Sequence, residues 1–74
     1  MKLSNLKISD KCIVKSVRSS DNIKRRLLDI GLTPGTMVEV VLENPGRNLK
    51  AYMIRGSLIA IRNSDSKDVL VDII

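Results

Sequence analysis

The sequence predicts a mainly β protein: a small, partly open barrel of five short strands with one main helix. Five short segments carry β-branched and aliphatic residues in alternating or continuous apolar runs, which is the pattern of strands. One stretch alone has apolar residues at helical spacing. Turn residues separate these segments, and closing strands this short into a barrel removes exposed edges that would otherwise invite aggregation.

Length and composition limit the protein to one small domain. The chain has 74 residues, so we expect a single domain over residues 1–74 with a marginal core. Hydrophobic residues make up 43% of it, but Tyr52 is the only aromatic, so the core should consist of Val, Ile, Leu and Met. A single cysteine, Cys12, excludes an internal disulfide and is expected to be a small buried thiol. Without a membrane span or a leader segment, the sequence predicts a soluble, cytoplasmic protein.

The first ten residues predict a lead-in segment that covers the core. Its apolar residues, Leu3, Leu6 and Ile8, are spaced among polar ones, so we expect their side chains to pack inward. The first strand is predicted over residues 11–17, where β-branched residues are frequent. A polar loop over residues 19–22 then leads into the helix.

The helix has clear start and stop signals. Asp21 is expected to cap its start, because a carboxylate there accepts bonds from free backbone N–H groups. Three aliphatic residues at helical spacing give the helix one apolar face: Ile23, Leu27 and Ile30. Gly31 stands where a left-handed residue ends a helix without a Cβ penalty. Leu32 follows at the position whose side chain often packs back on the last turn, here on Leu27.

A turn and a half-buried strand follow the helix. Pro34 and Gly35 predict a type II turn, because proline presets φ and glycine accepts a positive φ. A second strand is expected over residues 36–43. Its buried face is expected to consist of alternating residues: Val38, Val40 and Leu42. Across the whole chain, the residues that we expect to be buried include Leu27, Ile30, Val38, Val40 and Val71.

Three further strands complete the sheet after an Asn-Pro-Gly turn. Residues 49–55 and 57–61 predict two strands that meet at Gly56, and so short a connection is typical of a tight hairpin. Residues 63–68 are too polar for a strand and predict a helical turn. The last strand is predicted over residues 69–73.

Residues 25–35, Arg-Arg-Leu-Leu-Asp-Ile-Gly-Leu-Thr-Pro-Gly, followed by Val-Glu-Val at 38–40, resemble the signature of the FeoA family. The resemblance continues in the same order along the chain at residues 3–7, 55–56, 59–62 and 69–71. It implies an SH3-like five-stranded barrel with one main short helix between the first two strands. It also implies a cytosolic accessory protein of bacterial ferrous-iron transport, which docks on the cytosolic G-protein portion of the large membrane permease.

The residues offer little for catalysis. The chain has no histidine, the usual acid–base group at neutral pH, so Cys12 has no imidazole to activate it. No phosphate-binding loop or nucleophile motif is present. We therefore predict a protein that is not an enzyme and that needs no cofactor.

Metal binding is implied by the family resemblance only. One thiol and no imidazole are a poor set of ligands for a transition metal. Asp65 and Asp68 could hold a hard cation weakly if they shared a face, but a solvated acidic helical turn is favoured. No residue is therefore assigned to a metal site.

The net charge of +5 leaves a second hypothesis open. Such a charge fits a solvated surface as well as an acidic partner. Nucleic-acid binding is nevertheless disfavoured, because only Tyr52 could stack on bases and backbone contacts alone would be weak and salt-sensitive. Those contacts would come from Arg25, Arg26, Arg55 and Arg62.

A third hypothesis keeps the fold and changes its context. Similar barrels form the carboxy-terminal domain of metal-dependent repressors, where they act as regulatory modules. This chain has no helix-turn-helix segment, and Met1 begins its first motif. We therefore expect a stand-alone protein.

The predicted partner interface consists of Arg25, Arg26, Met37 and Val41. The two arginines flank the apolar stripe of the helix and should be exposed. Arg25 can instead pair with an aspartate on either side at helical spacing, whereas Arg26 has no acid four residues away. Met37 and Val41 alternate with the inward residues of the second strand, and either the helix or a partner would cover them.

Overall fold

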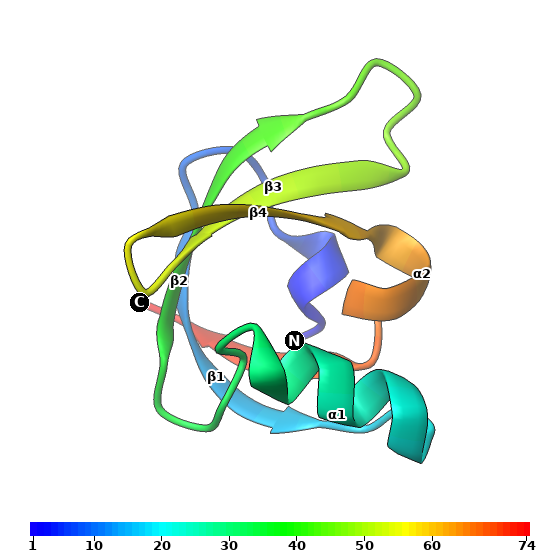
Figure 1. The fold of residues 1–74 in the computed structure, drawn as a ribbon. Helices are drawn as coiled ribbons and strands as arrows, with labels where there is room; N and C mark the ends of the chain where they lie inside the picture. Colours follow the sequence, from blue (N-terminus) through cyan, green and yellow to red (C-terminus); the bar gives the residue numbers. More distant parts are fainter.

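The protein is an antiparallel sheet of five strands that curls around a small core. The computed structural model describes residues 1–74, and its strands lie in the order β4-β3-β2-β1-β5. Figure 1 shows the sheet curling so that its two edge strands are not paired with each other. The strands are β1 Lys11–Val17, β2 Met37–Glu43, β3 Leu49–Ile54, β4 Ser57–Arg62 and β5 Val69–Ile73. The mainly β, five-stranded architecture that the sequence predicts is confirmed.

Helical segments fill the connections between the strands. The main helix, α1 (Asp21–Asp29), lies between β1 and β2, as expected (Figure 1). A single 3-10 turn, η1 (Leu3–Asn5), precedes β1. The polar segment after β4 forms the short helix α2 (Asn63–Ser66), which confirms the helical turn predicted there. Neither helix is long and apolar enough to cross a membrane.

The core is aliphatic, with a single aromatic ring at its centre. Tyr52 is completely buried, and so is Cys12. The methionines contribute nothing to it, because Met1, Met37 and Met53 are all exposed; the expectation of core methionines is wrong. The buried apolar residues are Leu3, Leu6, Cys12, Val14, Val17, Leu27, Leu32, Val38, Val40, Tyr52, Ile54, Ile61, Val69 and Val71.

Gly31 ends α1 with the geometry that the sequence predicts. Its φ is 111°, and the two backbone bonds of a Schellman stop are present. The Gly31 N–H donates to the Leu28 carbonyl at 3.0 Å, and the Leu32 N–H donates to the Leu27 carbonyl at 3.1 Å. Leu32 and Leu27 are buried in the same core, as expected. Ile30 was expected to be buried but is only half-buried, because it packs against the core and also lines an open hollow beside the helix.

The start of α1 differs from the expectation. The N-cap residue is Ser20, and it makes no side-chain capping bond. The prediction that Asp21 caps the helix is therefore wrong, because Asp21 is the first residue of the helix itself. From the first turn its carboxylate still favours the positive end of the helix dipole.

A β-bulge interrupts the alternation of β2. Its register with β3 shifts between Val40 and Leu42, so Val41 is the extra residue. Val38 and Val40 are buried as predicted, but Leu42 turns outward and is 56% exposed. The expectation that Leu42 lies on the buried face is wrong, because an extra residue reverses the side on which the following residues emerge.

Tight turns place the ends of the strands. Thr36 N–H donates to the Thr33 carbonyl at 3.1 Å and Gly35 has a φ of 91°, which agrees with the predicted type II turn. β3 and β4 are joined by Arg55 and Gly56, with φ values of 51° and 82°. Two consecutive positive φ values are typical of the type I′ hairpin turn, so the tight hairpin is confirmed.

The amino-terminal segment is fastened to the barrel by a buried lysine. Leu3 and Leu6 pack in the core, but Ile8 is 54% exposed, so its predicted burial is wrong. Lys50, on the inner side of β3, is 6% exposed. Its Nζ donates to the carbonyl of Ser4 at 2.6 Å and to that of Leu6 at 2.7 Å.

Candidate functional site

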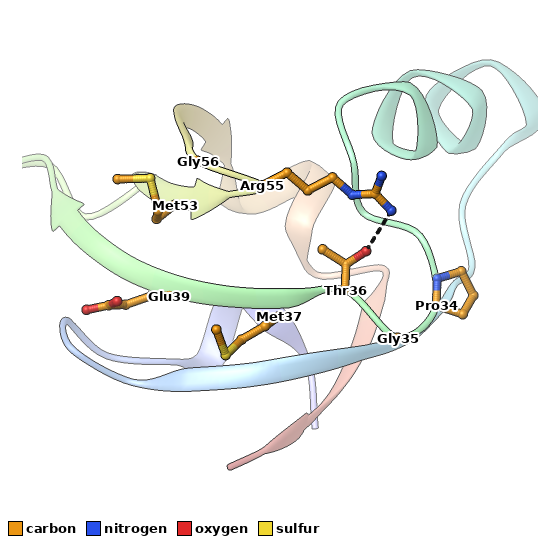
Figure 2. A pocket seen from close by; sticks show the side chains of 8 residues that line it. All are labelled: Pro34, Gly35, Thr36, Met37, Glu39, Met53, Arg55 and Gly56. Carbon is orange, nitrogen blue, oxygen red and sulfur yellow. Dashed lines mark hydrogen bonds between the residues drawn. The ribbon is translucent and has the colours of Figure 1, made fainter.

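The outer face of the sheet carries an open cavity beside the turn that precedes β2. It has a volume of about 530 Å³ and lies between the start of β2 and the β3–β4 hairpin (Figure 2). We call it the Met37 cavity. It is lined by Pro34, Gly35, Thr36, Met37, Glu39, Met53, Arg55 and Gly56.

Arg55 fixes one wall of this cavity. From its left-handed position in the hairpin, the side chain reaches across to the turn before β2 (Figure 2). Its Nη2 donates to Thr33 Oγ1 at 2.8 Å and to Thr36 Oγ1 at 3.3 Å. The only two ion pairs of the chain, Lys15–Asp72 and Arg26–Asp65, lie elsewhere. The Arg55 charge is therefore oriented by hydroxyls and has no carboxylate partner.

Exposed apolar side chains lie next to this charge. Met37 is 58% exposed, Met53 38% and Leu58 50%. The register places Met53 directly opposite Leu58 and directly opposite Glu39, so these side chains are neighbours on the outer face. We call Met37, Met53 and Leu58 the outer patch. Its arrangement beside one oriented cation is suited to contact with another protein surface.

The structure separates the four residues of the predicted interface. Met37 lines the cavity, whereas Val41 is half-buried at the bulge and lines no cavity. Arg25 is exposed and forms no ion pair, so the expected pairing with Asp21 or Asp29 does not occur.

Arg26 does have an acidic partner, which sequence spacing did not reveal. Its Nη2 lies 3.2 Å from Asp65 Oδ2 in α2, far away in the sequence. The Arg26 side chain also lines a groove between α1 and β4, away from the Met37 cavity. The predicted interface residues therefore lie on at least two different surfaces.

Sequence reasoning missed Met53 and Leu58, although signals for both were present. Met53 stands between Tyr52 and Ile54, which are buried, so strand alternation directs it outward. The two-residue hairpin at residues 55–56 then sets Leu58 opposite Met53. Arg55 was considered only as a contact for nucleic acid.

The Cys12 thiol and the Tyr52 hydroxyl, both buried in the core, keep their protons at physiological pH. Burial, and then the negative charge of Asp10, raises the pKa of the Cys12 thiol to about 11. Burial also raises the pKa of the Tyr52 hydroxyl above its ordinary value. Neither group is available as a nucleophile or ligand.

The acidic and sulfur ligands do not converge. No three side chains among Cys, Asp and Glu lie close enough together to hold a metal ion, and the chain has no histidine. This donor set does not fit a transition-metal centre, which needs several nitrogen or sulfur ligands. Asp65 is engaged by Arg26 instead.

Comparison with known proteins places the chain among characterised folds. The FeoA domain model matches residues 1–73. The crystal structure of Stenotrophomonas maltophilia FeoA, solved with zinc and described as a prokaryotic SH3 domain protein, is 33% identical, with a TM-score of 0.86 over 97% of this chain and 89% of that one. The solution structure of FeoA from Chlorobium tepidum is also 33% identical, with a TM-score of 0.91 over 99% of this chain and 70% of that one.

More distant matches share the fold alone. A manganese-dependent transcriptional repressor is 14% identical, with a TM-score of 0.88, and the match spans 99% of this chain and 40% of the repressor. No curated protein sequence matches the chain. These likenesses confirm the SH3-like barrel predicted from the sequence. With the family model matched over residues 1–73, the chain belongs to the FeoA family.

Proposed function

We propose that this protein is a non-enzymatic accessory factor of ferrous-iron uptake, which acts in the cytoplasm by docking on the cytosolic G-protein portion of the ferrous-iron permease. The observation that carries the proposal is the outer patch, with its exposed methionines next to the oriented charge of Arg55. Family membership supports the transport role, since the Stenotrophomonas maltophilia relative is proposed as a ferrous iron transport activating factor.

The chemistry of the outer patch fits a transient protein contact. Methionine side chains are flexible and polarizable, so they adapt to a partner surface. Arg55 adds a cation whose orientation is already fixed by Thr33 and Thr36, which reduces the ordering cost of binding. A transient regulatory contact buries an area near the small end for specific interfaces, so we expect a Kd in roughly the micromolar range.

The nucleic-acid hypothesis loses its main support in this structure. Stacking of bases needs exposed aromatic side chains, and Tyr52, the only aromatic, is 0% exposed. What remains is weak backbone binding by scattered cations. The repressor-like hypothesis rests on a shared fold, and fold alone does not carry function.

The test is titration of the isolated cytosolic portion of the cognate permease with variants of this protein. Met53→Glu should weaken binding about tenfold or more, because it places a charge in the apolar centre of the contact. Leu42→Glu is the matched control, since Leu42 is similarly exposed on the neighbouring strand but lies outside the Met37 cavity. Equal losses in both variants, or none in either, would contradict the assignment of the outer patch.

The interface residues predicted from the sequence are tested separately. Reversing the charges of Arg25 and Arg26 together should slow association, and high salt should shrink the effect, because rim charges mainly steer encounter. A mixed single-stranded oligonucleotide in parallel distinguishes the nucleic-acid hypothesis. Tight oligonucleotide binding with no permease binding would overturn the proposed function.

A further inference from the structure

A second hollow, separate from the Met37 cavity, runs between α1 and the edge strand β4. Its volume is about 340 Å³. Leu27 and Ile61, both buried, form its floor, and the half-buried Ile30 and Ile59 form its sides. We call this hollow the α1–β4 groove. An apolar floor beside a strand is the setting in which a further extended segment can bind.

The backbone of β4 is open on the side away from β3. β4 is an edge strand, and Asn63 N–H donates to the Asn48 carbonyl at 2.8 Å directly after it. Hydrogen-bonded and non-bonded pairs alternate along an antiparallel ladder. Counting back from the bonded residue Asn63 in steps of two, Ile61 and Ile59 direct their backbone groups towards β3. The backbone N–H and C=O groups of Ala60 then point away from β3.

The same alternation directs the backbone groups of Arg62 away from β3, where its carbonyl, as the N-cap of α2, accepts the first bond of that helix. The Arg62 N–H and both backbone groups of Ala60 take part in none of the backbone bonds outside the helices and strands. No side chain bonds to their backbone either. This stretch of β4 is therefore an uncovered strand edge, which can pair with a further strand.

One contact closes the groove at one end: Arg26 of α1 bridges to Asp65 of α2 at 3.2 Å. β4 has six residues, which at about 3.3 Å per residue admits only a short extended segment.

The positive charge of the groove favours an acidic binding partner. Arg62 lines it and forms no ion pair. Asp65, the only acid in the lining, is already neutralised by Arg26. A second copy of this chain is a poor occupant, because pairing of two β4 edges would bring two cationic rims together in a protein of net charge +5.

We propose that the α1–β4 groove binds a short extended segment of a partner protein in which acidic and aliphatic residues alternate. The segment adds to β4 as a further antiparallel or parallel strand through the open N–H and C=O groups of Ala60 and the open N–H of Arg62. Its aliphatic side chains cover Leu27 and Ile61, and its carboxylates pair with Arg62. Backbone bonds supply affinity in such a complex, and alternate side chains supply specificity. This inference uses a different surface from the outer patch and does not depend on the proposed function.

The experiment uses a capped peptide in which glutamate and valine alternate, titrated into the labelled full chain and followed by the amide signals in NMR. We expect the largest shifts at Ala60, Arg62 and Leu27. Two control peptides isolate the contributions: one carries lysine in place of glutamate, and one is N-methylated at alternate amides. Each should bind about tenfold or more weakly, because the first opposes the charge and the second blocks backbone pairing.

Variants complete the test. Arg62→Glu should reduce peptide binding about tenfold or more, and Lys24→Glu is its control, since Lys24 is an exposed cation of α1 that lines no cavity. Ala60→Pro removes an outward N–H from an edge strand, where proline is tolerated, and should also weaken binding. Equal affinity for the glutamate and lysine peptides, undiminished binding of the N-methylated peptide, or shifts confined to other strands would overturn the proposal. Met37→Glu should leave peptide binding unchanged, which separates this result from that of the permease titration.

Discussion

At the scale of single residues, Gly31 meets two demands at once. It takes a φ of 111° to end α1, and it lets the end of the helix pass close to the β3–β4 hairpin. A Cβ at this position would lie 2.9 Å from Ile54 Cγ2 and 3.3 Å from Arg55 Cδ. Only a residue without a side chain satisfies both the backbone geometry and the contact.

Gly31→Ala should therefore lower the free energy of unfolding by about 1–3 kcal/mol, since backbone strain and overpacking both act. Gly35→Ala is the matched control. Gly35 also has a positive φ, of 91°, but a Cβ there would meet no atom within 4 Å. The Gly35→Ala variant should lose less free energy of unfolding, because only backbone strain acts there. Urea unfolding of both variants measures the difference, and a Gly31→Ala protein as stable as the parent would contradict the stop geometry.

The Cys12 thiol makes stability depend on alkaline pH. Burial raises its pKa from 9.0 to about 11. Between these values the unfolded chain loses the thiol proton while the folded chain keeps it, so the folded state binds more protons and its stability falls as pH rises. The contribution is intact below about pH 9 and is lost progressively towards about pH 11.

We expect this group to remove roughly 2 kcal/mol of stability over that window. The measurement is urea unfolding at several alkaline pH values for the parent and for Cys12→Ala. Other titrating groups are common to both proteins, so the difference in slope isolates the thiol. Identical slopes would show that Cys12 ionises as readily in the folded chain as in the unfolded one.

At the scale of the elements, α1 is held to the barrel by one fully buried side chain, with Ile23 and Leu28 partly buried against the same core. Leu27 is the only residue of the helix that is buried, at 2% exposed. A nine-residue helix is too short to be stable alone in water, so its order depends on this packing.

Leu27→Ala should cost about 2–5 kcal/mol, from lost transfer energy plus a cavity. Because a small domain has little more than that in total, the variant should be largely unfolded. Leu28→Ala on the same helix is the control and should cost less, since Leu28 is only half-buried. Thermal melts followed by circular dichroism compare the two. Similar stabilities would mean that Leu27 does not anchor the helix.

Local signals were enough to place most elements from the sequence. Glycine, which tolerates a positive φ, marks the end of the helix, the turn before β2 and the β3–β4 hairpin. All three predictions are confirmed by positive φ values at Gly31, Gly35 and Gly56. The errors fall where a tertiary feature overrides local pattern. Leu42 faces outward because of a bulge in the pairing of β2 with β3, and single-residue alternation contains no sign of it.

The candidate site was harder to predict than the fold. Met37 could be recognised as outward-facing, but its relation to Met53 and Arg55 depends on the register of two strands. The partner of Arg26 is Asp65, which only the folding of the whole chain brings near. Contacts between segments that are distant in the sequence depend on the topology of the fold, so the spacing of residues along the chain could not predict them.

At the scale of the whole molecule, Lys50 fastens the amino-terminal segment to the barrel. Its buried ammonium group donates to the carbonyls of Ser4 and Leu6. The segment that it holds also pairs with β5, where the Val71 N–H donates to the Met1 carbonyl at 2.8 Å. Loss of this lysine should therefore loosen the amino-terminal segment and β5 together.

Lys50→Met keeps a long side chain but leaves two carbonyls without their donor, so it should cost about 1–3 kcal/mol. Lys15→Met is the control, because Lys15 is exposed and its 3.9 Å ion pair with Asp72 contributes little. Urea unfolding gives the stability, and hydrogen exchange at Val71 reports the local effect. Equal stability of the two variants would assign Lys50 no role in fastening the segment.

The buried position of Tyr52 has a practical consequence for all of these measurements. With no tryptophan or phenylalanine in the chain, its ring is the only strong near-ultraviolet chromophore, and it lies at the centre of the core. Any event that admits water to the barrel changes the polarity around that ring. The absorption and emission of the unlabelled protein therefore report on the integrity of its own interior.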